Sequence, residues 1–145
     1  MLAEAKAKEV QERTASLEEA ERLQLSRGEM VFEISQTRCS ADGRPVAVDT
    51  VILPATLFTR DAVREGADHS ILRLAKRAGV LLGTGEERVS LAQVDPATAK
   101  LLRTDAGTSV VRLDRIVNTI DGTPAEWRVA YCTMSGSAYV SQLRA

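Results

Sequence analysis

The sequence predicts an α+β fold in which one antiparallel β-sheet carries helices on one face. Two hairpins indicate the sheet, because Asp42-Gly43 and Asp121-Gly122 each lie between runs that alternate apolar and polar residues. Short capped helices separate these hairpins, in place of the crossover connections of a parallel sheet. The 145 residues are enough for one domain with its own apolar core.

The first elements follow from local patterns. Residues 1–15, rich in Ala, Glu, Lys and Arg, are typical of a solvated helix or a linker. Ser16 and Glu19 form a capping-box pattern that begins a short helix, with Gly28 as the expected stop beyond its end. From Met30 the apolar period changes to two, which predicts a strand.

The later elements are assigned by the same signals of period, capping and turn. Ser70 and Gly79 bound one helix as cap and stop, and Asp95 followed by Pro96 opens another. In order, we expect a loop with one helical turn over 53–66, a helix over 70–78, a strand over 86–94, a helix over 96–102, hairpin strands over 110–117 and 125–133, and a closing edge strand over 137–143.

Composition argues against several classes of protein. The 19 basic and 20 acidic residues give a net charge of −1, so this chain alone is a poor candidate for gripping nucleic acid. No apolar run approaches the length of a membrane span or follows Met1 as a secretory signal would, which favours a cytoplasmic protein without membrane contact. With one histidine, His69, a His-rich metal site is excluded, and we expect no metal and no cofactor. Cys39 and Cys132 lie in strand-like runs and are expected to be reduced, small apolar residues.

The register of the first hairpin brings charged residues onto one face. A two-residue loop at Asp42-Gly43 sets Gln36 opposite Asp49 and Arg38 opposite Ala47, so Arg38 and Asp49 are diagonal neighbours. A buried carboxylate is costly unless it is paired and hydrogen-bonded. Asp49 therefore either forms a structural bridge with Arg38, or both residues line a polar pocket.

The second hairpin gives a similar mixed face. The same arithmetic sets Arg115 opposite Arg128, with Glu126 nearer the turn. Like charges opposed on a sheet cost energy unless an anion lies between them, and either Glu126 or a bound ligand can supply that anion. Trp127 falls on the opposite face, where we expect it under a helix or in a dimer contact.

Four blocks of the sequence, in this order and at this spacing, resemble the UTRA domain, the effector-binding half of GntR-family transcription regulators of the HutC subfamily. They are LEEAERLQLSRGEMVFEI, SADGRPVAVDTVILPATLF, HSILRLAKRAGV and the closing block from VDPATAKLL to AEWRVAY. The resemblance covers about residues 17–145. It implies a chorismate lyase-like fold, with a UTRA domain over 16–145 and a linker or helical extension over 1–15. Such regulators carry a winged helix-turn-helix domain before this one, and that domain is absent here.

The resemblance also implies a set of ligand contacts. In related domains the acid after PVA and the acid of the second hairpin contact a small ligand, and Asp49 and Glu126 occupy these places. The serine that opens the next helix is Ser70, and the tyrosine after the second acid is Tyr131. The family's Arg-x-Arg before ADG is replaced, so that Arg38 alone remains there and Arg128 is a further counter-charge. The implied ligand-binding set is Arg38, Asp49, Ser70, Glu126, Arg128 and Tyr131.

The implied function is that of a small-molecule sensor without catalytic residues. Its effector is a sugar phosphate, an organic acid or a similar compound, and its contact with DNA is made by a domain outside this chain. We also expect a homodimer, because the closing strand over 137–143 and the aromatic residues Trp127 and Tyr131 suit an interface. Two alternatives remain: a lyase-like enzyme acting on a small organic acid, and a dimerisation module that binds no ligand.

Overall fold

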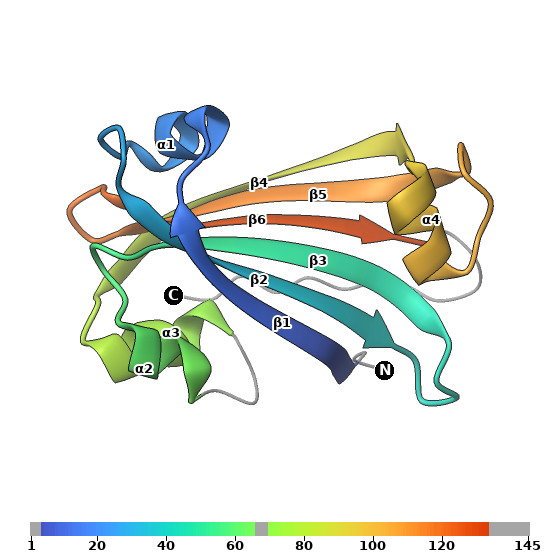
Figure 1. Cartoon of the computed structure of the whole chain (residues 1–145), viewed down its shortest axis with the longest axis horizontal. Coiled ribbons are helices and arrows are strands. Elements are labelled where there is room, and N and C mark those ends of the chain that lie inside the picture. The colour runs from blue at the N-terminus through green and yellow to red at the C-terminus, as the bar shows by residue number, and fades with distance from the viewer. Residues whose placement is uncertain (1–3, 66–69, 134–145) are drawn as a thin grey trace.

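The computed structural model describes residues 4–65 and 70–133 (Figure 1). Six strands and four helices follow one another along these residues, with neighbouring strands in sequence at β2–β3 and β5–β6, as in α+β folds. They are β1 (Glu4–Thr14), α1 (Leu17–Leu23), β2 (Met30–Cys39), β3 (Pro45–Pro54), α2 (Arg60–Arg64), α3 (Ile71–Ala78), β4 (Leu82–Gln93), α4 (Pro96–Leu102), β5 (Ser109–Thr119) and β6 (Pro124–Cys132).

The six strands form one sheet in which every neighbouring pair is antiparallel. Their order is β1-β2-β3-β6-β5-β4, so the two hairpins, β2–β3 and β5–β6, meet at the centre of the sheet. Figure 1 shows β1 and β4 at the two edges. The α+β class and the antiparallel sheet predicted from the sequence are confirmed.

The prediction of a helix or linker over residues 1–15 is wrong for Glu4–Thr14, which forms the edge strand β1. This strand pairs with β2 along its length, so that Glu4 lies opposite Cys39 and Thr14 opposite Met30. Val10 packs against the apolar cluster beside the sheet. Strand pairing and this packing outweigh the helix propensity of the Ala, Glu and Lys residues, which is a weak local preference.

The predicted hairpin registers are confirmed, although the turns differ from the predicted two-residue loops. Gly43 N–H donates to the carbonyl of Ser40 at 2.9 Å, and Ser40 N–H donates to the carbonyl of Arg44 at 2.8 Å. Gly43 takes the left-handed φ of 83° that such a turn with a bulge requires. A register shift between Arg38 and Cys39 then restores the predicted pairing, in which Arg38 lies opposite Ala47.

Helices cover both faces of the sheet, whereas the sequence predicted one face. Apolar residues occur on both sides of the strands, and each apolar face has to be covered. Helices α2 and α3 pack on the face that carries Phe32 and Val51, here called the inner face. Helices α1 and α4 pack on the opposite, outer face, over two separate clusters. The α1 cluster contains Leu23, Val31, Ile52 and Trp127, and the α4 cluster contains Val94, Ala99, Leu102 and Val110.

Helix α1 is fixed to the outer face through Asp114 of β5. Its Arg22 donates from Nη2 to Asp114 Oδ1 at 2.7 Å, and Trp127 donates from Nε1 to the same oxygen at 2.9 Å. The Arg22 guanidinium lies 5.2 Å from the centre of the Trp127 ring, within cation–π range. Trp127 therefore packs under a helix, one of the two positions expected for it.

The capping box of α1 is confirmed, because Glu19 N–H donates to Ser16 Oγ and the Glu19 carboxylate accepts from Ser16 N–H. The helix ends at Gln24, whose φ is 54°, and Gly28 instead lies in the turn before β2. The strand expected over 137–143 lies outside the described residues. Within the described ranges, no helix is long and apolar enough to cross a membrane.

Candidate functional site

A row of alternating charges crosses the inner face of the sheet. It begins on β2, where Arg38 donates from Nε to Asp49 Oδ2 at 2.8 Å. Arg128 on β6 donates from Nη1 to the same Asp49 oxygen at 3.0 Å. The predicted pairing of Arg38 with Asp49 is confirmed, and a second arginine joins it.

The row continues through Glu126 of β6. Arg128 donates from Nη2 to Glu126 Oε2 at 3.3 Å, and Arg115 donates to Glu126 Oε1 from Nε at 3.0 Å and from Nη2 at 2.5 Å. Glu126 thus lies between the two arginines that face each other across β5 and β6. The sequence indicated either Glu126 or a bound ligand as the anion between Arg115 and Arg128, and Glu126 takes this position. Together with Gln36, these five residues are called the charge network below.

All members of the charge network except Arg38 are buried. Asp49 and Glu126 have no exposed surface, and Arg115 and Arg128 are 7% and 8% exposed. Taking such groups out of water costs several kcal/mol per ion, which the ion pairs offset only with good geometry. Within the network three guanidinium groups face two carboxylates, and Glu87 of β4 lies opposite Arg115 on the same face of the sheet.

The hydrogen bonds to Asp49 are concentrated on one of its two oxygens. Oδ2 accepts from Gln36 Nε2 at 3.2 Å as well as from Arg38 and Arg128. Among the described residues, Asp49 Oδ1 and Gln36 Oε1 are buried without a hydrogen-bond partner. Buried acceptors in folded proteins are rarely left unsatisfied, so these two oxygens are suited to a donor group on a bound molecule.

Apolar residues lie beside the network on the inner face. Ala47, Leu113, Ala130 and Cys132 form a small cluster on one side of it. Burial raises the pKa of the Cys132 thiol to about 12, and the negative charge of Asp49 adds to this shift. Cys132 is therefore a protonated thiol at neutral pH, as expected of a small apolar strand residue.

Four of the six predicted ligand residues come together in the network, namely Arg38, Asp49, Glu126 and Arg128. Ser70 occupies the N-cap of α3, which packs on the inner face, and its side chain makes no capping hydrogen bond with the helix. Its predicted ligand contact stays a prediction.

Tyr131 is not brought to the network. Glu126, Arg128 and Ala130 point to the inner face, and side chains alternate along a strand, so Tyr131 points to the outer face. There it packs against the α4 cluster. Its assignment to the same site as Asp49 came from the resemblance, and the period of β6 places it elsewhere.

Two members of the network, Gln36 and Arg115, were not in the predicted set. The register already set Gln36 opposite Asp49 and Arg115 opposite Arg128, so the sequence did carry a signal for both. The predicted set followed the family motif, which consists of the acids and of the arginines before the first turn. Gln36 and Arg115 lie outside that motif and were therefore not included.

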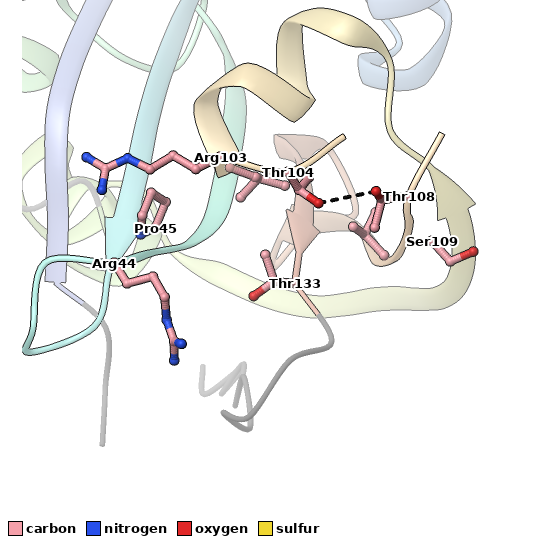
Figure 2. Close-up of a pocket in the computed structure, with 9 residues that line it drawn as sticks. Arg44, Pro45, Arg103, Thr104, Thr108, Ser109 and Thr133 are labelled. Atoms are coloured by element: carbon pink, nitrogen blue, oxygen red, sulfur yellow. Dashed lines mark hydrogen bonds between the residues drawn. The ribbon is translucent and has the colours of Figure 1, made fainter. Parts of the chain in front are cut away.

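A separate pocket of about 500 Å³ lies at one end of the sheet (Figure 2). It contains no member of the charge network. Figure 2 shows Arg44 and Arg103 extending away from the hydrogen-bonded pair Thr104 and Thr108, so its polar groups do not converge on one point. The lining residues are Arg44, Pro45, Leu102, Arg103, Thr104, Thr108, Ser109, Val110 and Thr133.

The six-stranded antiparallel sheet with helices on both faces defines a chorismate lyase-like α+β domain. The sequence profile of the UTRA domain matches residues 3–135, nearly the whole chain, and the chain belongs to this family. The matched region includes β1. Among proteins with curated descriptions, none shows significant similarity to this chain.

Solved structures share this fold, and regulators of the GntR family are among them. The ligand-binding domain of a protein assigned to the GntR family of transcriptional regulators, from Bordetella bronchiseptica, is 25% identical over 98% of this chain and 89% of that chain, with a TM-score of 0.82. A GntR-family regulator from Enterococcus faecalis is 20% identical over 97% of this chain and 99% of that chain, with a TM-score of 0.80. PhnF from Mycobacterium smegmatis is 24% identical over 97% of this chain and 61% of that chain, with a TM-score of 0.79.

Proposed function

We propose that the charge network is part of an effector site, and that ligand binding there modulates operator binding by a DNA-binding domain outside this chain. The observation that carries this proposal is the pair of buried acceptors, Asp49 Oδ1 and Gln36 Oε1, next to the three arginines of the network. A purely structural set of ion pairs would be expected to satisfy both oxygens. Membership of the UTRA family and likeness to a ligand-binding domain support the same role.

The chemistry of the network narrows the class of effector. A hydroxyl or amine group satisfies the acceptors on Asp49 and Gln36, since each can accept a hydrogen bond. An anionic group is suited to the guanidinium groups of the network. Its expected contact is Arg38, whose side chain is 23% exposed, compared with 9% for Arg115 and 10% for Arg128. A hydroxylated organic acid and a sugar phosphate both meet these requirements.

The full regulator that we propose is a cytoplasmic homodimer of the HutC subfamily that binds its effector without converting it. The likeness to GntR-family regulators supports this role. The expectation that Trp127 and Tyr131 form a dimer interface no longer holds. Trp127 is 8% exposed and packs under α1, and Tyr131 packs under α4. The dimer therefore needs a different surface.

The experiment that tests the proposed function is a thermal-shift screen of the purified chain. The panel consists of inorganic phosphate, hexose 6-phosphates, hydroxylated aliphatic acids and aromatic acids, and each hit is repeated by calorimetry and incubated to look for product. Saturable binding without product supports a sensor, and product formation would favour the enzyme. If extraction of the purified protein yields no small molecule and no member of the panel binds, the effector site is contradicted.

A further inference from the structure

Gln36 and Asp49 lie directly opposite each other on β2 and β3, and both are buried. Gln36 is 3% exposed and donates from Nε2 to Asp49 Oδ2 at 3.2 Å. An ionised carboxylate only accepts hydrogen bonds, so Asp49 fixes which end of the Gln36 amide faces it. The Gln36 oxygen is therefore turned away from Asp49, and among the described residues it is a buried acceptor without a donor.

The side chains beside this pair leave both oxygens unpaired. Residues two positions apart on a strand share a face, so Ile34 lies beside Gln36 and Val51 lies beside Asp49. These two apolar side chains have no exposed surface and no polar group to offer. Arg38, the polar neighbour on β2, directs its Nε–H to Asp49 Oδ2 and leaves Oδ1 unpaired. A bound molecule can supply the two missing donors.

The charges around Asp49 favour an uncharged donor over an ammonium group. Asp49 carries one negative charge and already accepts from two guanidinium groups, those of Arg38 and Arg128. Glu126, the next carboxylate of the network, is held by Arg115 and Arg128. A third cation at Asp49 would meet like charges in a buried site, where their repulsion is stronger than in bulk water. Its ammonium group would also bring three N–H donors to two acceptors.

We infer that Asp49 and Gln36 form a subsite for a hydroxyl group of the effector, and that Gln36 selects this hydroxyl over an ammonium group. The inference rests on the proposed effector site and narrows the class of its ligand. A hydroxyl group donates its hydrogen to either oxygen and adds no charge, and a second hydroxyl on the neighbouring carbon atom can satisfy the other oxygen. Gln36 selects because its amide offers an acceptor without the negative charge that an ammonium group needs.

The first test compares matched ligands on the wild-type chain. The compounds of a series differ at one carbon atom, which carries a hydroxyl group, an ammonium group or only hydrogen. The series are malate, aspartate and succinate; lactate, alanine and propionate; and the 6-phosphates of glucose, glucosamine and 2-deoxyglucose. In the series that binds most tightly, calorimetry is expected to show a preference of roughly tenfold or more for the hydroxyl compound over both others. Equal or tighter binding of either other compound would overturn the inference.

The second test changes Gln36 and repeats the titrations with that series. Gln36→Glu keeps the size of the side chain and adds a negative charge, so the preference is expected to move from the hydroxyl compound to the ammonium compound. Gln36→Met removes the acceptor and is expected to reduce the preference over the compound with only hydrogen.

The matched control is Gln93→Met, because Gln93 is an exposed glutamine of β4, and it is expected to keep the wild-type preference. Melting curves show whether each variant is folded, and the wild-type comparison decides the hydroxyl subsite if a Gln36 variant does not fold. A preference that is unchanged in both folded Gln36 variants would contradict the selecting role of Gln36.

The hydroxyl subsite and the proposed effector site can fail separately. If a series binds but its hydroxyl compound is not preferred, the effector site stands and the hydroxyl subsite is contradicted. If no compound of any series binds to the wild type, the hydroxyl subsite is contradicted, and the effector site is then decided by the wider panel and by extraction of the purified protein.

Discussion

Arg128 on β6 donates a hydrogen bond to Asp49 on β3 across a separation of 79 residues in the chain, with 3.0 Å between Nη1 and Oδ2. This contact joins the polar halves of the two hairpins at the centre of the sheet, where β3 and β6 are neighbours. Both side chains are buried. The pair therefore contributes to the choice of register between the hairpins as well as to the charge balance of the site.

Breaking this pair from one side is expected to be strongly destabilising. Arg128→Met leaves the buried Asp49 carboxylate with one arginine fewer, which should lower the free energy of unfolding by about 3–5 kcal/mol. Asp49→Asn in the same chain removes the charge and should recover part of that loss, because the two substitutions are coupled. Urea denaturation of the two single variants and the double variant measures the coupling. Strictly additive losses would show that the ion pair is not formed.

The contact between Trp127 and Asp114 is expected to hold α1 on the outer face. Trp127→Phe keeps an aromatic ring but removes the Nε1–H donor and weakens the contact with Arg22, so stability should fall by about 1–2 kcal/mol. Thermal denaturation followed by circular dichroism measures the change. An unaltered melting temperature would mean that apolar packing alone holds the helix.

The stability contributed by Glu19 should depend on pH. The hydrogen bond from Arg13 lowers the pKa of Glu19 below its ordinary value of 4.5, despite partial burial, and the capping contacts with Ser16 act in the same direction. A group with a lowered folded-state pKa stabilises the protein above its unfolded pKa, and this contribution is lost as pH falls through the folded-state pKa. Glu19→Gln should therefore cost about 1–2 kcal/mol at neutral pH and progressively less below pH 4.5.

The control for this prediction is Glu18→Gln, because Glu18 lies exposed in the same helical turn. It should change stability little at either pH, since exposed charges contribute weakly. Melting curves of both variants across the acid range give the comparison. A Glu19→Gln penalty that stays constant down to strongly acidic pH would refute the role of the Arg13 contact.

Cys132 should be unreactive in the folded protein. Burial, with the nearby Asp49 charge, raises the pKa of its thiol to about 12, and the thiolate is the reactive form. Mass spectrometry after iodoacetamide treatment should show no label on Cys132 in native buffer and full label in urea. Rapid labelling of the native protein at neutral pH would point to an accessible thiolate and revive a redox role.

The sequence predicted the centre of the sheet well because two independent signals agree there. The alternation of β2 and β3 and the Asp42-Gly43 turn both place Gln36 opposite Asp49, and tertiary packing has no reason to override them. The edge strand β1 was missed because its residues favour a helix locally, and only pairing with β2 makes them a strand. Sequence alone could not reveal this non-local contact.

The candidate site was also predicted only in part from the sequence. Register arithmetic found the ion pair of Asp49 with Arg38 but not the one with Arg128. The resemblance alone supplied Tyr131, which the two-residue period of β6 places on the outer face, away from the network. The unsatisfied oxygens of Asp49 and Gln36 have no sequence signature, because they depend on which atoms of each side chain the arginines occupy. Only the three-dimensional structure shows which oxygens of Asp49 and Gln36 are left without a donor.

The most direct test of the effector site is calorimetric titration of Asp49→Asn with the tightest ligand from the panel. Asp114→Asn is the matched control, because Asp114 also pairs with two arginines but lies on the outer face. We predict that Asp49→Asn loses about 1–3 kcal/mol of binding free energy while remaining folded, and that Asp114→Asn binds as the wild type does. Unchanged affinity of a less stable Asp49→Asn would contradict the effector site and leave Asp49 as a structural ion pair.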